Sequence, residues 1–338
     1  MSNGSGIMDS DAPIRWGIVG AGRIAGIFAT DMPLAPGAEL VAVASRDQAK
    51  ADAFGDRFNI PRRYGSYQEM IDDPEVDVVY VATTHPSHRD VTIDLLNAGK
   101  HVLCEKPFAM NTAEAREMIE AARQNNRFLM EAMWTRFRPA MVKVREFIQG
   151  GEIGEVQYLT ANMGWNNPFD PEFRLYNKAL GGSALLDAGV YAVSFAHMVL
   201  GEPDQIVSVA TLGETGVDEN CMITTHYPSG AVANAGITVR ANSRNLAMVA
   251  GTKGSILMDH DWHRPSTFTI FRDGQEPEFF DCSHEGTGYQ FEMIEVMNCI
   301  REGKTEHPVM PLDETLQIQG IMEKVIKDWG VTYPSDRD

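Results

Sequence analysis

The sequence predicts two domains: a doubly wound parallel α/β domain, followed by an α+β domain with a mostly antiparallel sheet. Three observations predict them. First, a chain of 338 residues is longer than a single hydrophobic core usually supports. Second, short apolar runs alternate with helical stretches from Ile14 to about Glu131. Third, consecutive strands without intervening helices follow. We therefore expect a disordered tail over residues 1–12, the first domain over 13–135 and the second over 136–338.

Five strands and five helices are expected in the first domain. The strand candidates are rich in Val and Ile, as in parallel strands covered on both faces, and lie at Ile14–Val19, Leu40–Ala44, Val76–Ala82, His101–Cys104 and Arg127–Met130. Helix candidates alternate with them near 22–32, 47–58, 66–72, 86–98 and 112–125. This alternation predicts a doubly wound sheet.

The second domain begins where the alternation of strands and helices ends, at about residues 135–150. A helix is expected over 183–200, where Gly201 stops it, and two more near 288–302 and 313–329. Strand-like runs separated by turn signals such as YPSG and RDG lie at 205–212, 220–227, 231–239, 246–250, 254–258, 267–272 and 276–281. Strands that follow one another without helices favour an antiparallel sheet.

Composition and charge narrow the functional classes. Hydrophobic residues make up 43% and charged residues 22%, which is ordinary globular composition. No apolar run approaches the roughly 18–20 residues that span a bilayer, and no secretory leader is visible. The net charge of −18 argues against a generic affinity for nucleic acid or anionic membranes. Cys104, Cys221, Cys282 and Cys299 form no close pair, which suits a reducing cytoplasm.

The clearest single motif is a glycine-rich turn directly after the first strand. In IRWGIVGAGRIAGIF, Gly20, Gly22 and Ala25 form G-x-G-x-x-A. Gly20 permits the tight turn, Gly22 lets the backbone approach a pyrophosphate, and Ala25 lets the helix pack closely on the sheet. Free N–H groups at the helix start favour phosphate. We expect the dinucleotide at Gly20, Gly22, Arg23 and Ile24. The alternative is a glycine turn in an α/β fold that binds no dinucleotide.

Basic residues after the second strand favour NADP over NAD. NAD binders place an acidic residue at this strand end, where it holds the ribose 2′-hydroxyl. Here the strand LVAVA runs into Ser45 and Arg46, with Lys50 one helical turn further and Asp47 nearby. A hydroxyl and two cations suit a 2′-phosphate, because Arg presents a planar fork to phosphate oxygens. If Arg46 and Lys50 are only solvated helix charges, NAD binds instead.

Two further segments carry candidate chemistry. CEKPF places Glu105 and Lys106 at the carboxyl end of the fourth strand, where open α/β sheets bind ligands, and Pro107 could sit in a cis bond. In GGSALLDAGVY, Asp187 and Tyr191 are four residues apart and share one face of the expected helix. A charged Asp in an apolar helix needs a partner, and Lys106 of the other domain is a natural one. A structural buried acid and a core aromatic fit the residues equally well.

Four motifs in order resemble those of one family. GIVGAGRIA, CEKPFAMN, EAMWTRFRP and GGSALLDAGVY together resemble the Gfo/Idh/MocA family, the glucose–fructose oxidoreductase and inositol dehydrogenase group. The resemblance runs from about Ile14 to the end and is closest to the dimeric dihydrodiol dehydrogenase and NADP-dependent D-xylose dehydrogenase branches. It implies an N-terminal Rossmann domain, a C-terminal α+β domain with a large, mostly antiparallel open sheet, and a homodimer or dimer of dimers formed through that sheet.

The resemblance also implies roles for individual residues. Lys106 and Tyr191 match the family's catalytic pair, Asp187 matches its supporting acid, and Arg46 and Lys50 match basic residues at the 2′-phosphate. The other residues expected at the cofactor are Ser45, Thr83, His85, His88, Glu105 and Arg136, and those expected near the substrate are Trp134, Arg136, Trp165 and Tyr289. The inositol dehydrogenase branch has His where Tyr191 stands, which favours the aldose or dihydrodiol branch.

We therefore expect hydride transfer between nicotinamide and a carbinol carbon of a small molecule, either a sugar such as D-xylose or a trans-dihydrodiol. Tyr191 is the expected acid/base. An unperturbed Tyr has a pKa of about 10, and a nearby Lys106 ammonium favours the phenolate. We expect Asp187 to orient Lys106. The aromatic residues of 163–177 suit a sugar face or an aromatic diol equally, and a loop packed on the sheet or at a dimer contact accounts for them as well.

Other functional classes stay open. No metal site is predicted, because His85 and His88 are accompanied by neither a helical HExxH nor a Cys/His cluster. A non-enzymatic NADP-binding sensor on the same fold is one alternative, although such a protein is expected to lack Lys106 or Tyr191. A glycosidase that oxidises its substrate transiently with bound NAD is another, and Ser45 with Arg46 argues against it.

Overall fold

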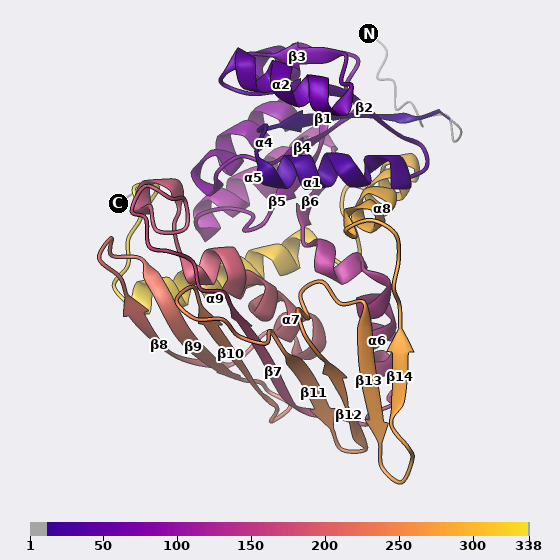
Figure 1. Cartoon of the computed structure of the whole chain (residues 1–338), viewed down its shortest axis with the longest axis vertical. Helices are drawn as coiled ribbons and strands as arrows, with labels where there is room; N and C mark the ends of the chain where they lie inside the picture. The colour runs from indigo at the N-terminus through magenta and orange to yellow at the C-terminus, as the bar shows by residue number, and fades with distance from the viewer. Residues whose placement is uncertain (1–11, 337–338) are drawn as a thin grey trace. The chain divides into compact units, whose positions relative to one another are not determined.

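The computed structural model describes residues 12–336, and the chain divides into two compact units (Figure 1). The first comprises the described residues up to Ala109, Ala113–Trp134 and Glu285–Leu316. The second comprises Met110–Thr112, Thr135–His284 and the described residues from Gln317 onwards. The tail expected over residues 1–12 lies, apart from Ala12, outside the described residues.

A six-stranded parallel sheet forms the centre of the first unit. Its strands are β1 (Ile14–Val19), β2 (Ala38–Ala44), β3 (Arg62–Tyr64), β4 (Val78–Val81), β5 (His101–Glu105) and β6 (Leu129–Ala132), in the spatial order β3-β2-β1-β4-β5-β6. β4 and β6 are buried throughout, as expected for strands covered on both faces. The order reverses between β1 and β4, so the carboxyl ends of these strands flank the point at which such sheets bind ligands.

Helices alternate with these strands as the sequence predicts. They are α1 (Arg23–Asp31), α2 (Gln48–Phe58), α3 (Tyr67–Asp72), α4 (His88–Asn97) and α5 (Thr112–Asn125). Local signals set their ends: Asp47 caps α2, Asn59 ends it in the left-handed region at φ 55°, and Ser66 with Glu69 forms a capping box for α3. The predicted doubly wound domain is confirmed. The sheet also contains β3, whose Arg-Arg-Tyr sequence lacks the apolar signal of a strand.

The segment Glu285–Leu316 belongs to the first unit, contrary to the prediction that it lies in the second domain. Its helix α8 (Tyr289–Arg301) packs on α1. At the end of α1, the fully buried Asp31 carboxylate accepts hydrogen bonds from the backbone N–H groups of Thr287, Gly288 and Tyr289, each at 2.9 Å. These contacts join residues that are far apart in the chain, so local patterns do not reveal them.

An eight-stranded sheet forms the centre of the second unit. Its strands are β7 (Val156–Gly164), β8 (Gln205–Leu212), β9 (Asp218–His226), β10 (Val232–Thr238), β11 (Ala247–Gly251), β12 (Gly254–Met258), β13 (Thr267–Arg272) and β14 (Glu278–Asp281), in the order β14-β13-β12-β11-β7-β10-β9-β8. β7 and β10 are parallel, and the other neighbouring pairs are antiparallel. The predicted mostly antiparallel sheet is confirmed, but β7, which lies inside it, is not among the predicted strands.

The two faces of this sheet differ. Helix α7 (Val190–Leu200) and the second-unit part of α9 (Leu312–Asp328) lie over one face. Helix α6 (Pro139–Gln149), which is not among the predicted helices, packs Phe147 on Phe268 and Phe280. The strand register places large, exposed apolar side chains on the opposite face: Tyr158, Val207, Val209, Met222, Phe271 and Phe279. That face is therefore apolar and open.

One described stretch, Lys178–Leu200, is long and apolar enough to cross a membrane by length and composition, contrary to the expectation that no such run exists. It is not one regular helix. A 3-10 turn at Lys178–Leu180 and a π-helical turn at Leu185–Gly189 precede α7. Of its most apolar window, 78% is buried, as for a helix in a protein core.

Candidate active site

The glycine-rich turn between β1 and α1 has the geometry that a dinucleotide needs. Gly20 has φ +100°, and a Cβ there would lie 2.6 Å from the carbonyl oxygen of Ala82 after β4, so only glycine fits. A Cβ at Gly22 would meet no protein atom within 4 Å, which leaves the approach to the helix open. Arg23 and Ile24 begin α1, which has neither a side-chain cap nor an acidic residue in its first turn. Its N–H groups are therefore oriented for phosphate oxygens.

The residues after β2 separate two cations from the carboxylate near them. Ser45 is buried, and its hydroxyl accepts a hydrogen bond from the Asp47 N–H at 3.3 Å. The Asp47 carboxylate accepts from the first backbone N–H groups of α2 and so caps that helix. Arg46 and Lys50 are exposed, and Arg46 also hydrogen-bonds to Tyr67 of α3. Asp47 is thus engaged by the helix, while both cations present their charge at the surface.

The turn after β5 carries Lys106. Glu105, the last residue of β5, is buried and accepts hydrogen bonds from the Tyr80 hydroxyl and, at 3.1 Å, from the Lys106 backbone N–H. Burial, followed by the nearby charge of Glu105, raises the pKa of Tyr80 well above its ordinary value. Tyr80 therefore stays protonated and donates to the Glu105 carboxylate. The Lys106–Pro107 peptide bond is cis.

His88 joins the ends of β4 and β5. Its Nδ1 lies 3.0 Å from the carbonyl oxygen of Pro107, and its Nε2 lies 3.2 Å from that of Thr83. The ring is fully buried, and burial lowers its pKa. The His85 ring lies 5.9 Å away between centroids. His88 thus fixes Thr83 and Pro107, which border the ligand-binding end of the sheet. Among residues 12–336, no group of three or more His, Cys, Asp and Glu is placed to hold a metal ion.

Two residues expected near the substrate lie together in the first unit. The rings of Trp134 and Tyr289 are stacked, with centroids 4.5 Å apart and an angle of 12° between the planes. Phe28 of α1 contacts Tyr289 edge-on and stacks on Tyr80. The aromatic chain therefore connects the cofactor helix, the Glu105 network and the start of α8.

Tyr191 lies in a ring cluster of the second unit. It is the second residue of α7 and is 7% exposed. Its ring centroid lies 5.5 Å from that of His263, and His263 packs edge-on against Trp165 at 5.4 Å. The Thr135 hydroxyl donates to the backbone carbonyl of His263 and so fixes that loop. The structure thus groups Trp165 with Tyr191, and it adds His263, which no sequence pattern marks.

Polar contacts hold the segment that carries Asp187 and Tyr191. The buried Asp218 carboxylate accepts from the Leu185 N–H at 2.8 Å, at the start of the π-helical turn that contains Asp187. Asp187 itself accepts from Arg174 at 2.9 Å. π-helical turns inside α-helices, such as Leu185–Gly189, are frequent at functional sites, because they change the direction of the side chains around them.

Arg136, which lies far before α7 in the chain, also supports the helix that carries Tyr191. It is 2% exposed and donates to the Ser194 hydroxyl at 3.0 Å and to the Ser194 carbonyl at 2.7 Å. Ser194 lies within α7, less than one turn after Tyr191. The structure therefore places Arg136 in the second unit as a buried anchor of α7.

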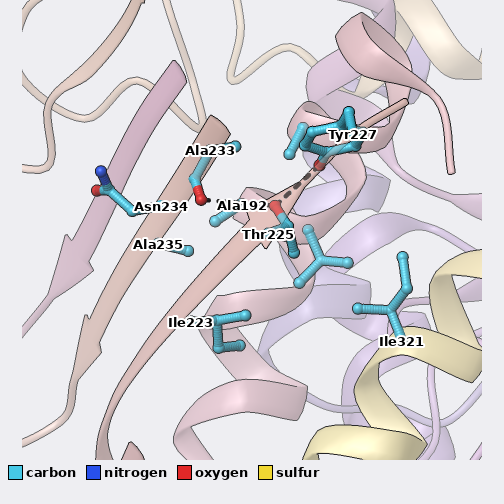
Figure 2. Close-up of a pocket in the computed structure, with 10 residues that line it drawn as sticks. Ala192, Ile223, Thr225, Tyr227, Ala233, Asn234, Ala235 and Ile321 are labelled. Carbon is cyan, nitrogen blue, oxygen red and sulfur yellow. Dashed lines mark hydrogen bonds between the residues drawn. The ribbon is translucent and has the colours of Figure 1, made fainter. Parts of the chain in front are cut away.

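A small cavity lies between α7, α9 and the sheet of the second unit (Figure 2). It has a volume of about 20 Å³, which suits one water and not a sugar or a diol. Ala192 and Ala196 of α7 line it together with Ile223 and Ile321. Its polar edge holds Thr225, whose hydroxyl donates to Tyr227 at 3.0 Å (Figure 2). Tyr191, His263 and Trp165, which form the ring cluster, do not line this cavity.

These features define a class of protein. A phosphate-binding turn at the switch point of a Rossmann sheet, a lysine turn beside it and a second α+β unit are those of a dinucleotide-dependent oxidoreductase. A family model described as "Oxidoreductase family, NAD-binding Rossmann fold" matches residues 14–133, and the GFO/IDH/MocA C-terminal domain model matches residues 141–257. The chain belongs to the Gfo/Idh/MocA oxidoreductase family, and it is an enzyme of the dehydrogenase and reductase type.

Characterised proteins resemble the chain over nearly its whole length. Trans-1,2-dihydrobenzene-1,2-diol dehydrogenase of Mus musculus is 40% identical over 335 residues, which cover 96% of this chain and 99% of the relative. The aldose-aldose oxidoreductase of Caulobacter crescentus is 28% identical, with a TM-score of 0.84 over 93% of this chain and 97% of that one. A 3-ketoreductase of Actinomadura kijaniata, solved with NADP, is 25% identical, with a TM-score of 0.83 over 93% and 97% of the two chains.

Proposed function

We propose that the protein is an NADP-dependent dehydrogenase that transfers hydride between nicotinamide and a carbinol carbon of a trans-dihydrodiol or of an aldose. The observation that carries this proposal is the near full-length likeness to the mouse dihydrodiol dehydrogenase. The Caulobacter oxidoreductase supports a sugar as the second candidate substrate. Trp134 and Tyr289 are buried and stack on each other, so they do not favour one of these substrates over the other.

The choice of NADP rests on the residues after β2. Arg46 and Lys50 are exposed there, and Asp47, the one carboxylate at this strand end, caps α2. A 2′-phosphate therefore meets two cations and the Ser45 hydroxyl, whereas a 2′-hydroxyl lacks the acceptor that NAD binders provide.

The chain's own residues would handle the proton. Bound NADP supplies the hydride acceptor or donor. Tyr191 takes the substrate hydroxyl proton during oxidation and returns it during reduction, and the Lys106 ammonium favours the phenolate form that oxidation needs. Asp187 supports this pair, and Arg174 holds the Asp187 carboxylate. Arg136 and Asp218 position the Tyr191 segment through Ser194 and Leu185.

Absorbance of NADPH tests the proposal. The purified chain is offered trans-dihydrodiols, aldoses and deoxysugars with NADP or with NAD. Net NADPH formation with a diol or an aldose is the expected result. Product formation without net change in the cofactor would favour the transient-oxidation glycosidase, and the absence of turnover across the panel would favour a sensor.

We infer in addition a cytoplasmic homodimer. Its support is the apolar open face of the second-unit sheet, where Val207, Val209 and Phe279 are 70%, 66% and 64% exposed. A second copy of the chain covers such a face by pairing it with itself. The four free cysteines suit a reducing compartment.

A further inference from the structure

Residues 331–336, which follow α9 in the second unit, are held in a defined turn that the proposed chemistry does not use. Val331 and Tyr333 are buried, with 2% and 5% of their surface exposed. The Tyr333 N–H donates to the Asp336 carboxylate at 2.7 Å, and the Asp336 N–H donates to the Tyr333 carbonyl at 3.0 Å. These two bonds close residues 333–336 into a turn.

The Tyr333 hydroxyl reaches the start of the helical segment that carries Asp187 and Tyr191. It donates to the Gly182 carbonyl at 3.0 Å, and this bond is buried. Burial, and then the charge of Asp218, raises the pKa of Tyr333. The hydroxyl therefore keeps its proton and acts as a donor to the Gly182 carbonyl.

Gly182 is fixed on its other side as well. Its N–H donates to the Asn177 carbonyl at 2.9 Å. A Cβ at Gly182 would lie 2.8 Å from the Asn177 nitrogen and 2.8 Å from the Leu175 carbonyl oxygen, so only glycine fits there. The next residue, Ser183, is fully buried, and its hydroxyl accepts from the Leu186 N–H at 2.9 Å, as a cap does. The Tyr333 bond therefore acts one residue before the cap of the helical segment.

The same turn also binds the chain that follows the Lys106 turn. The side-chain amide of Asn111 donates to the Asp336 carboxylate at 3.4 Å. Thr112 donates to the Glu323 carboxylate of α9 through its N–H at 2.8 Å and through its hydroxyl at 2.5 Å. Met110–Thr112 belongs to the second unit, as residues 331–336 do. A series of contacts within one unit thus leads from Asn111 through the 333–336 turn to Gly182.

We propose that Tyr333 is a positioning residue that holds the start of the helical segment carrying Tyr191. Through Asp336 it also couples that start to Met110–Thr112, which follows the Lys106 turn. The inference rests on the proposed function, because Lys106 and Tyr191 are the acid/base pair of that function. Without the Tyr333 hydroxyl, the buried Gly182 carbonyl loses a donor, and the start of the segment shifts. A displacement of about 1 Å is enough to lower turnover greatly.

Turnover of Tyr333→Phe tests this role, with Tyr227→Phe as the matched control. Both variants keep a buried ring of the second unit and lose one hydroxyl, but Tyr227 bonds to Thr225 of the sheet. We expect Tyr333→Phe to lower kcat for a dihydrodiol or an aldose about ten-fold and to leave the KM for NADP unchanged, because the glycine-rich turn lies in the first unit. Tyr227→Phe should change kcat by less than about two-fold, even where its Tm falls as far. Equal kcat in the two variants overturns the proposal.

A combined variant tests whether Asp336 and Tyr333 act as one connection. Asp336→Ala removes the acceptor of both the Tyr333 N–H and the Asn111 amide. Asp336 is exposed, so we expect the single variant to lower kcat only about three-fold, and the double variant to fall no further than Tyr333→Phe. Asp328→Ala, which breaks an exposed pair with Lys324, is the control and should keep full activity. Losses that multiply, or full activity in Asp336→Ala, overturn the coupling.

Hydrogen exchange distinguishes a failure of this inference from a failure of the proposed function. It is measured on the full chain without substrate, at the amides of residues 183–190. Tyr333→Phe should raise their exchange rates about five-fold, and Tyr227→Phe should leave them unchanged. Equal exchange in the two variants overturns the inference, whether or not any substrate is turned over. If exchange rises in Tyr333→Phe but no diol or sugar reacts, the proposed function fails and the role of Tyr333 in holding the segment stands.

Discussion

Tyr191 is the residue on which the proposed chemistry depends most. Replacing it with Phe keeps the ring that packs beside His263 and removes only the hydroxyl. We expect kcat of Tyr191→Phe to fall at least about 100-fold, as when a general acid/base is lost, with NADP affinity unchanged. Steady-state kinetics and a cofactor titration measure both quantities. Near-full activity in this variant would make Lys106 the leading acid/base.

Arg46 and Lys50 are the residues that we propose select NADP over NAD. The double substitution Arg46→Ala and Lys50→Ala should raise the KM for NADP at least about ten-fold and change the KM for NAD little, because only NADP carries the 2′-phosphate. Arg57→Ala is the control, since Arg57 lies in the last turn of the same helix and packs over Phe58. An equal loss with both cofactors would contradict the assignment.

Residues inside a motif could be predicted from the sequence, and residues that act across the fold could not. Gly20 and Lys106 belong to contiguous motifs, so their roles and their positions at the ends of strands could be predicted. His263 meets Trp165 and Tyr191 only through tertiary packing and stands in no recognisable pattern. Asp31 resembles any polar residue at a helix end until its hydrogen bonds to the 287–289 backbone are known.

At the scale of elements, Asp31 joins α8 to α1, and its loss should destabilise the first unit. Asp31→Ala removes the acceptor of the Thr287 and Tyr289 N–H groups, leaves the Gly288 N–H with Gln290 alone, and removes an anion from a helix start. We expect the free energy of unfolding to fall by about 3 kcal/mol. Urea unfolding measures it. Asp313→Ala, which breaks only an exposed pair with Arg123, is the control and should stay close to the unsubstituted chain. Equal losses in the two variants would contradict a special role for Asp31.

Elements with a strong apolar period were predictable, and those defined by their neighbours were not. The predicted bounds of β1 agree with the observed ones, because Ile14–Val19 is almost wholly apolar and is buried. β7 was missed although it carries a strand signal: the buried Leu159, Ala161 and Met163 alternate with Thr160 and Asn162, as in a half-buried strand. The polar edge strand β3 has no apolar signal and exists through its pairing with β2.

At the scale of the whole molecule, the open face of the second-unit sheet is the basis on which we expect a dimer. Six large apolar side chains share this face, and Val209 at 66% exposed lies beside Met222 in the register of β8 and β9. A stable interface covers about 800 Å² on each partner, and an eight-stranded face offers an area of that order. A charge placed on Val209 would be buried without a partner in the dimer and fully hydrated in the monomer.

Val209→Asp should therefore halve the mass of the particle in solution. Light scattering after size exclusion should give twice the chain mass of 37.4 kDa for the unsubstituted protein and a single chain mass for the variant. Gln124→Asp, a charge added at an exposed position of α5, should leave the mass unchanged. A thermal melt would show whether the variant is folded. A monomer in the unsubstituted protein, or a dimer that survives in a folded Val209→Asp variant, would exclude this face as the interface.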